Sequence, residues 1–270
     1  MICPICNSIE FTTTFKFKDK NYLVCKRCRS AVFSPVPSEK EIDEFYKNYV
    51  TYKSGLTEYM TEATYPAFVS NLEYTLSDLG QPLKNDKISL VDVGCGNGFF
   101  LKFLSEKYPN ITIQGVDLSK ECVESCKARG LNVTIGDVFS LDQEKKYDFI
   151  SLFHVIEHVK NPVEWIRRIN QQLNKGGHFI IETPVYGIVA ESFAENWRYF
   201  MPVEHLQLFS KNALLELLKA EGFEILSHIT YGSGNNAPDI QPANKKAMDR
   251  FAKLTGKGDT LSIYARKINS

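Results

Sequence analysis

The sequence predicts an α/β fold in which a Rossmann-like, doubly wound parallel sheet follows a small zinc-ribbon-like segment. Strand and helix patterns alternate from Lys87 to Thr183, which is typical of a parallel sheet covered by helices. Four cysteines lie in two tight pairs within the first 30 residues. We therefore divide the chain into a zinc-ribbon-like segment (1–33), a helical linker and cap (34–86) and an α/β domain (87–270) with lid insertions at about 185–208 and 231–258.

The composition excludes several classes of protein. The 270-residue chain carries 32 Lys and Arg against 32 Asp and Glu, and a net charge of zero argues against a general nucleic-acid binder. The 18 Phe and 13 Tyr exclude disorder as the dominant state. No apolar run approaches the roughly 20 residues of a membrane helix, and the N-terminus shows no secretory signal. We therefore expect a cytoplasmic protein.

The first 86 residues are predicted to hold short strands and two helices. Strand-like stretches cover 11–18 and 21–24, and the two prolines that follow Ser34 break the chain. Ser38 with Glu41 three residues later indicates a helix start. A second helix is expected over about 57–79, with a break near Tyr65 because Pro66 follows it.

The α/β domain is predicted element by element from the apolar spacing. Strands are expected at 88–93, 111–118, 132–135, 147–153 and 178–183, and helices at 99–107, 120–129 and 162–173, the last closed by Gly176 and Gly177. A helix at 211–221 and strands at 223–229 and 260–266 complete the domain. The 30 residues between the last two strands, and the aromatic-rich stretch after 185, are expected as long connections.

The four N-terminal cysteines have the spacing of a metal site. Cys3 and Cys6 form one Cys-x2-Cys pair, and Cys25 and Cys28 form a second pair 18 residues later. Two such knuckles supply the four thiolates of a closed structural zinc site, whose binding would help so short a segment to fold. The alternatives are four unrelated core cysteines or a redox pair. A closed site has no open position for substrate, so we assign this zinc a structural role.

A glycine loop after the first strand of the domain predicts a nucleotide-type ligand. Gly94, Gly96 and Gly98 sit between a strand and a helix, where glycines let a ligand approach the backbone. A dinucleotide site needs glycine where this chain has Phe99, so NAD is disfavoured. Asp117 ends the next strand and suits the two hydroxyls of a ribose. After the third strand, the Asp137 carboxylate and the Val138 amide suit the adenine edge.

These motifs resemble the class I S-adenosylmethionine-dependent methyltransferases. The resemblance rests on LVDVGCGNGFFLKFL, GVDLS, IGDV and YDFISLFHVIEHV in this order, and covers about Lys87 to Ile229. It implies a sheet of seven strands, the last (260–266) antiparallel to the others. It also implies a cofactor site formed by Asp92, Gly94, Cys95, Gly96, Asn97, Gly98, Asp117, Leu118, Asp137, Val138, Phe153 and His154. Asp92 and Cys95 have structural alternatives, in holding the loop backbone and in filling space. Zinc knuckles occur only in some branches of this family.

Methyl transfer mainly requires that the acceptor be positioned and water excluded, and a hydroxyl acceptor also needs a base. The candidates are His154, Glu157, His158 and His205. We favour His205 as the general base and His154 as the second choice, with Glu204 orienting His205. Helical spacing would place His154 and His158 on one face, and His158 has the alternative of a packing residue.

Two local patterns bear on this choice. The order His-x-x-Glu-His also occurs in zinc proteases, but here it follows the fourth strand of a methyltransferase pattern, and we reject the protease interpretation. The stretch EHLQLFS from Glu204 to Ser210 resembles small-molecule methyltransferases, including zinc-bearing sugar C-methyltransferases. Those enzymes carry an active-site Tyr where this chain has Pro202, which puts the sugar-deprotonation role in doubt.

The sequence therefore predicts an S-adenosylmethionine-dependent methyltransferase that acts on a small polar metabolite. We favour a hydroxyl of a sugar, nucleotide-sugar or surface-glycan precursor as the acceptor, with carbon and nitrogen acceptors left open. The alternatives are an RNA base methyltransferase that docks RNA on its zinc knuckles, and a cofactor-binding module without catalysis. The sequence sets neither the oligomeric state nor the acceptor's identity.

Overall fold

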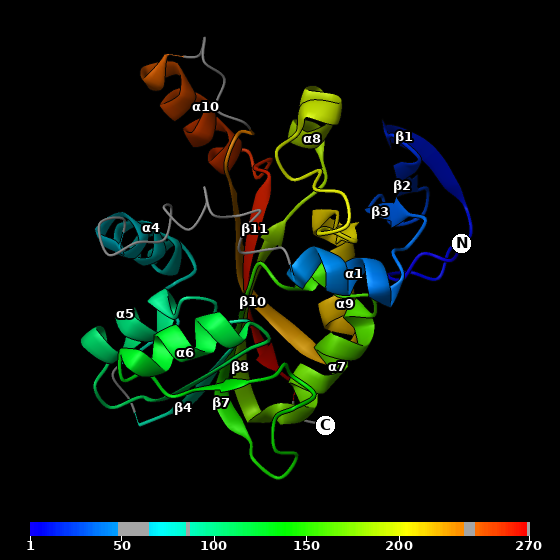
Figure 1. Ribbon diagram of the computed structural model, residues 1–270. Coiled ribbons are helices and arrows are strands. Elements are labelled where there is room, and N and C mark those ends of the chain that lie inside the picture. The colour runs from blue at the N-terminus through cyan, green and yellow to red at the C-terminus, as the bar shows by residue number, and fades with distance from the viewer. Residues whose placement is uncertain (48–64, 85–86, 235–240, 269–270) are drawn as a thin grey trace.

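The computed structural model describes residues 1–47, 65–84, 87–234 and 241–268. These residues form a seven-stranded sheet with helices on both faces and a separate four-stranded sheet near the N-terminus (Figure 1). Within these ranges, no helix combines the length and the apolar character that crossing a bilayer requires.

The large sheet has the order β10-β11-β8-β7-β4-β5-β6. Its strands are β4 (Ser89–Val93), β5 (Thr112–Asp117), β6 (Val133–Ile135), β7 (Tyr147–Phe153), β8 (Leu173–Pro184), β10 (Phe223–Tyr231) and β11 (Thr260–Lys267). The pairings among β4, β5, β6, β7 and β8 are all parallel, whereas β11 is antiparallel to both β8 and β10. This arrangement confirms the expected seven strands and the reversed last strand.

Helices cover the two faces of this sheet. On one side lie α4 (Tyr65–Asp78), α5 (Phe99–Lys107) and α6 (Lys120–Ala128), and on the other α7 (Pro162–Gln172) and α9 (Lys211–Ala220) (Figure 1). Successive strand residues point to opposite faces, so Leu90 packs with α4 and α5 while Val91 packs with α7 and α9. Burial on both faces explains why the central strands read as continuous apolar runs.

The glycines after α7 differ from the prediction. The helix ends at Gln172, one residue before the expected end, but Gly176 and Gly177 lie within β8, which begins at Leu173, and do not close the helix. The last carbonyl groups of the helix are satisfied from another strand, because Lys267 Nζ donates to the oxygens of Asn170 (2.8 Å) and Leu173 (3.0 Å). This partner is distant in sequence, so local patterns could not reveal it.

Both long connections contain regular structure that the sequence analysis missed. The first holds α8 (Ile188–Phe193) and the 3-10 turn η3 (Ala194–Asn196), and leads to the short strand β9 (Gln207–Leu208). The second holds α10 (Pro242–Leu254), which begins with proline in its first turn, a favourable position for that residue. The part of this connection at 235–240, and the part of the expected second helix at 57–64, lie outside the described residues.

The N-terminal sheet is completed by the α/β domain. Its order is β1 (Phe11–Phe17), β2 (Lys20–Cys25), β3 (Ala31–Ser34) and then β9, which pairs antiparallel with β3. Tyr22 packs on Phe200 with ring centroids 4.7 Å apart, and its hydroxyl donates to the His205 carbonyl at 2.8 Å. The zinc-ribbon-like segment therefore shares its sheet and its core with the 185–208 connection.

The predicted helix start at Ser38 is confirmed by α1 (Glu39–Lys47). Ser38 Oγ accepts from the Glu41 amide at 3.2 Å, and Glu41 Oε2 accepts from the Ser38 amide at 2.8 Å. This reciprocal capping box satisfies two amides that a helix N-terminus otherwise leaves unpaired. Lys20 pairs with Glu41 at 2.8 Å and ties the helix to β2.

Ser210 joins the two parts of the molecule, and its removal should destabilise both. Its Oγ caps α9 by accepting from Ala213 N at 3.1 Å and donates to the Cys28 carbonyl at 2.6 Å. We expect Ser210→Ala to lower the free energy of unfolding by about 1–2 kcal/mol, as the loss of an N-cap does. Denaturant unfolding measures this change, with the exposed Ser105→Ala as the control, expected to stay within about 0.5 kcal/mol of the parent. Equal midpoints for both variants would contradict this role.

Candidate active site

The glycine loop lies at the carboxyl end of β4, where three parallel strands meet at one edge of the sheet. Gly94 and Gly96 have φ angles of +76° and +50°, which L side chains rarely adopt. A Cβ on Gly94 would collide with Val155, whereas the space beside Gly96 is open. The backbone of the loop therefore packs against Val155 at Gly94, whereas at Gly96 no atom of the protein occupies the space that a ligand would use.

Two acidic residues stand beside this loop at the tips of β5 and β6. Asp117 Oδ2 accepts from the Gly96 amide at 2.7 Å, and its Oδ1 accepts from the Ser119 amide at 2.8 Å. Asp137 Oδ1 accepts from the Phe139 amide at 2.9 Å. The apolar side chain of Leu118, the residue after Asp117, is 71% exposed. An exposed apolar surface flanked by acceptors fits the face and the edges of an adenosine.

Other predicted cofactor residues support the loop from behind. Asp92 is buried and accepts from Ser151 Oγ at 2.7 Å, and burial raises the pKa of its carboxyl to about 7. Cys95 is also buried, and Asn97 Oδ1 lies 3.6 Å from Cys122 Sγ. Val138 is fully buried. Cys95 thus packs in a buried cluster, as its space-filling alternative expects, whereas the hydrogen bond of Asp92 goes to a β7 side chain and not to the loop backbone.

Phe99 explains why the loop departs from the dinucleotide pattern. Its ring is buried against Tyr65 and Phe68 of α4, with centroid distances of 5.3 and 5.7 Å. Through these contacts, α4 covers the start of α5. Phe99 thus serves a contact between two helices, whereas the dinucleotide pattern has a glycine at this position for close packing of the helix on the strand.

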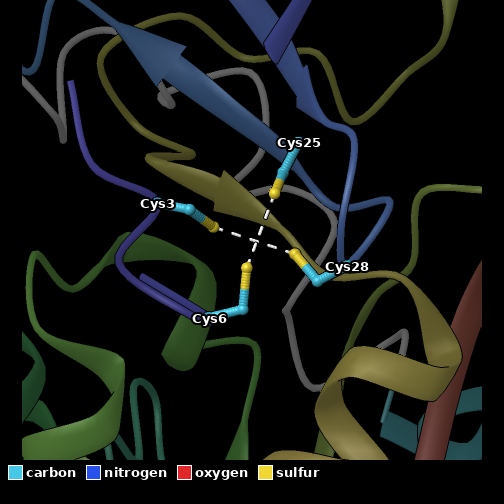
Figure 2. Close-up of side chains that lie close together, drawn as sticks. All are labelled: Cys3, Cys6, Cys25 and Cys28. Atoms are coloured by element: carbon cyan, nitrogen blue, oxygen red, sulfur yellow. Dashed lines mark hydrogen bonds between the residues drawn. The ribbon is translucent and has the colours of Figure 1, made fainter. Parts of the chain in front are cut away.

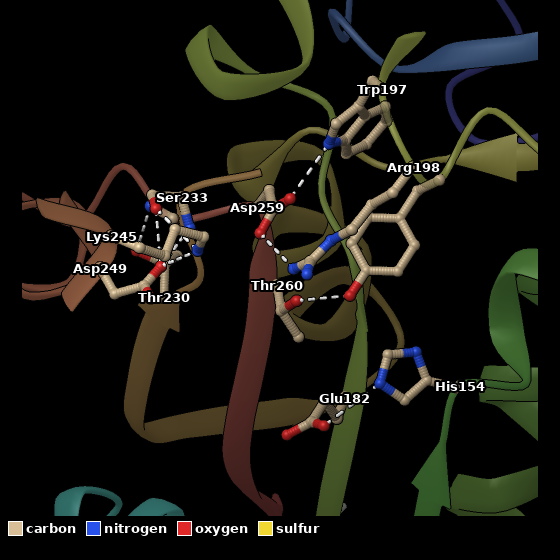
Figure 3. A network of polar contacts seen from close by, with 12 residues as sticks. His154, Glu182, Trp197, Arg198, Thr230, Ser233, Lys245, Asp249, Asp259 and Thr260 are labelled. Atoms are coloured by element: carbon tan, nitrogen blue, oxygen red, sulfur yellow. Dashed lines mark hydrogen bonds and ion pairs between the residues drawn. The ribbon is translucent and has the colours of Figure 1, made fainter. Parts of the chain in front are cut away.

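His154 lies at the tip of β7 between two carboxylates. Its Nδ1 is 3.3 Å from Glu157 Oε1, and its Nε2 is 3.3 Å from Glu182 Oε1 (Figure 3). Although burial opposes a positive charge, hydrogen bonds to Glu157 and Glu182 raise the pKa of His154 well above its usual range. Burial opposes the charge of Glu182 too, but its contact with His154 lowers the pKa of that carboxyl.

The two carboxylates favour the protonated form of His154, a form that cannot accept a proton from an acceptor hydroxyl. The role of His154 as the second-choice general base stays a prediction. Its side chain is 42% exposed, so the ring is accessible from the site. Sequence reasoning missed Glu182, one of these two carboxylates. The sequence did offer one signal for Glu182. It lies near the end of the predicted strand at 178–183, and the ends of parallel strands meet at one edge of the sheet.

The expected helical face for His154 and His158 is also absent. Only residues Ile156–His158 form a short 3-10 turn, η2, and His154 has a positive φ of 53°. The two rings instead contact the same carboxylate, since His158 Nε2 lies 3.9 Å from Glu157 Oε1. The His154 amide donates to the carbonyl of Glu182 on β8 at 2.9 Å, so this amide is paired with the sheet and not within a helix.

The connection after β8 is fastened over this site by polar contacts with β11. Asp259 is buried and accepts from Trp197 Nε1 at 3.1 Å and from the Arg198 guanidinium at 2.9 Å. Tyr199 Oη lies 3.0 Å from Thr260 Oγ1, and the Tyr199 ring stacks near His154 at a centroid distance of 6.4 Å. The predicted lid at 185–208 is therefore held against the strand tips.

Glu204 and His205 lie in this connection, and both are buried. The Nδ1 atom of His205 is 2.8 Å from the Tyr199 carbonyl, so a backbone group orients this ring. Burial, with repulsion from His158 as a second cause, lowers the pKa of His205 to about 4. The Glu204 carbonyl in turn accepts from His158 Nδ1 at 2.9 Å.

The four predicted zinc ligands converge on one point (Figure 2). The Sγ atoms of Cys3 and Cys28 are 3.7 Å apart, and those of Cys6 and Cys25 are 3.5 Å apart. Both knuckles fold alike, since the amides of Asn7 and Arg29 donate to the carbonyls of Cys3 and Cys25. Sulfur atoms around a tetrahedral zinc ion with bonds of about 2.3 Å would lie about 3.8 Å apart, so the residues fit this metal.

The comparisons with known proteins agree with this geometry. A family model described as a methyltransferase domain matches residues 68–228, which is more than half of the chain. The chain belongs to this family of S-adenosylmethionine-dependent methyltransferases. A solved S-adenosylmethionine-dependent methyltransferase from Archaeoglobus fulgidus has the same fold, with a TM-score of 0.57 and 18% identity over 79% of this chain and 99% of that one.

Two relatives indicate the breadth of this methyltransferase family. A probable (S)-tetrahydroprotoberberine N-methyltransferase 2 of Papaver bracteatum is 32% identical over 92 residues, which are 32% of this chain and 26% of that protein. The ubiquinone biosynthesis O-methyltransferase of Pelagibacter ubique is 26% identical over 181 residues, which are 58% of this chain and 73% of that protein. The match thus spans about a quarter of the first relative's length.

The charge on His154 gives a pH-dependent prediction. A histidine whose pKa is raised by folding adds to the free energy of unfolding. This contribution is complete below the usual histidine pKa of about 6.5 and is lost as the pH rises through the pKa of the folded state. We expect the wild-type ring to stay protonated through neutral pH in an NMR titration. Glu182→Gln should move the titration to lower pH, and the exposed Glu164→Gln should not. A ring that titrates at its usual pH in the wild type would contradict the assigned charge.

Proposed function

We propose that this methyltransferase transfers a methyl group to a small, polar, hydroxyl-bearing metabolite such as a sugar, a nucleotide sugar or a surface-glycan precursor. The proposal depends above all on the ion cluster at the strand tips, in which the 42% exposed His154 lies against the buried carboxylates of Glu157 and Glu182. Charged groups there would bind hydroxyl groups well and an apolar acceptor poorly.

The surroundings of this cluster support a polar acceptor. Burial and the neighbouring Glu182 carboxylate raise the pKa of Tyr231 well above its usual range, so its phenol stays a neutral donor. Tyr199 adds a second hydroxyl beside Thr260. Tyrosine hydroxyls and carboxylates together provide the donors and acceptors that sugar hydroxyls need.

S-adenosylmethionine supplies a methyl group already activated by its sulfonium, so the chain's residues chiefly bind and orient. We assign the open side of the loop at Gly96 to the methionine part, Asp117 to the ribose, and Asp137 with Val138 to the adenine edge. Phe153 and His154 lie at the tip of β7, next to the expected sulfonium position. Oxygen is our proposed acceptor atom, and the general-base role of His205 stays a prediction.

The acceptor class is tested by product analysis. The purified protein is incubated with S-adenosylmethionine and, separately, with nucleotide-diphosphate sugars, an alkaloid-type amine, a quinol-type phenol and transfer RNA. We expect S-adenosylhomocysteine and a methylated product only with the sugar acceptors. Turnover confined to the amine, the phenol or RNA would overturn the proposed acceptor, and cofactor binding without turnover on any of them would favour a binding module.

The assignment of Asp117 is tested by cofactor affinity. Asp117→Ala removes a charged acceptor and should weaken S-adenosylhomocysteine binding by about 1–3 kcal/mol. Isothermal calorimetry measures the change, and Asp142→Ala is the matched control because its carboxylate caps only an exposed local turn. Unchanged affinity in Asp117→Ala would remove this residue from the ribose site.

We also propose that Cys3, Cys6, Cys25 and Cys28 bind one structural zinc ion. The knuckle that holds Cys28 contacts Ser210, so the ion would stabilise the join between the N-terminal sheet and α9. Cys28→Ser should remove one equivalent of zinc, measured by elemental analysis after chelator-free purification, and should lower the unfolding midpoint. Cys122→Ser should keep the metal. A disulfide among the four cysteines in reduced, metal-replete protein would argue against the site.

A further inference from the structure

A second group of metal-ligand side chains lies apart from the four cysteines. Glu157 and His158 come from η2, and His205 comes from the segment just before β9. One carboxylate oxygen and one nitrogen from each imidazole all lie within 4.8 Å of one another. The two histidine rings meet edge to face, with centroids 4.9 Å apart.

Backbone carbonyls fix which nitrogen of each ring carries the proton. His158 Nδ1 is 2.9 Å from the Glu204 carbonyl, and His205 Nδ1 is 2.8 Å from the Tyr199 carbonyl. A carbonyl can only accept, so both Nδ1 atoms must donate, and in the neutral rings both Nε2 atoms carry lone pairs. Metal-binding histidines are typically held in this way by a hydrogen bond from the other ring nitrogen.

The third group is a buried carboxylate whose two oxygens face different partners. Glu157 is fully buried, and its Oε2 accepts from Thr183 Oγ1 at 2.9 Å. Its Oε1 pairs with His154 Nδ1 at 3.3 Å and lies 3.9 Å from His158 Nε2. A carboxylate oxygen has more than one lone pair, so Oε1 can pair with His154 and also bind an ion on the side of His158.

We propose that Glu157 Oε1, His158 Nε2 and His205 Nε2 bind a divalent transition-metal ion of the zinc class. Two imidazoles and one carboxylate are a ligand set that suits Zn²⁺ and Fe²⁺ and leaves a further position open. Ligand atoms around such an ion, with bonds of about 2.0–2.1 Å, lie about 3.3 Å apart. The three atoms, now within 4.8 Å, would therefore need to close by no more than about 1.5 Å.

This ion would join two parts of the site. The ion would link η2, the turn that follows β7, to the connection that carries β9. Through β9 this connection pairs with β3 of the N-terminal sheet. The ion would also use the Nε2 lone pair of His205, and one lone pair cannot serve both as a metal ligand and as a general base. With the ion bound, His205 could not also act as the general base, so the metal role is an alternative to the predicted base role of this residue.

The experiment is a metal count on the intact chain, because a loss of turnover alone would fit either role of His205. Protein purified without chelator is supplied with Zn²⁺ or Fe²⁺, desalted and analysed for metal content. We expect wild-type protein to hold one equivalent more than both His205→Ala and Glu157→Gln. His228→Ala, which alters a histidine on β10, should match the wild type.

Co²⁺ substitution distinguishes this site from the cysteine site. The difference spectrum between wild-type and His205→Ala protein should show weak ligand-field bands without thiolate charge-transfer absorption, while Cys28→Ser should lose the thiolate absorption and keep those bands. S-adenosylhomocysteine binding and circular dichroism check that each variant is folded. Equal metal content in wild-type protein and folded His205→Ala, or thiolate absorption in the difference spectrum, would overturn the proposal.

Discussion

The parallel pairing of β4 with β5 and β7 is the constraint on which the site depends. In this register, Val93 pairs with Val116, and Asp92 pairs with both Gly115 and Ser151, so the three strands end together. The glycine loop, Asp117 and His154 follow these ends and thus meet at one edge of the sheet, although they are up to 60 residues apart in sequence. A slip in register would separate them, which is why chemistry in such sheets gathers at the carboxyl ends of the strands.

A second constraint comes from the N-terminal sheet. Strand β9 has two residues and gains its ladder only by pairing with β3, and Tyr22 donates to the His205 carbonyl from the same sheet. The cysteine-rich part of the chain therefore helps to hold the segment that carries Glu204 and His205, together with contacts inside the segment such as that of His205 Nδ1 with the Tyr199 carbonyl. An ion bound by the four cysteines, as we propose, would add to this support.

Electrostatic competition decides the roles of the histidines. His154 is charged because two carboxylates outweigh its burial, whereas His205 is neutral because burial and a neighbouring histidine outweigh Glu157. The same carboxylate, with its pKa lowered to about 2 despite its burial, faces His154, His158 and His205. One buried carboxylate therefore links His154, at the tip of β7, to His205 in the 185–208 connection.

The sequence by itself determined the sheet of the α/β domain, the glycine loop with its two acidic partners, and the convergence of the four cysteines. These features depend on local periodicity and on short motif spacing, which a chain displays wherever its partners lie. Tertiary structure decided what depends on distant partners: the early start of β8 at Leu173, the existence of β9, and the pairing of His154 with Glu182. It also decided the pKa of His205, because that pKa follows the burial of the ring and its neighbours, and these are set only by the packing of the 185–208 connection.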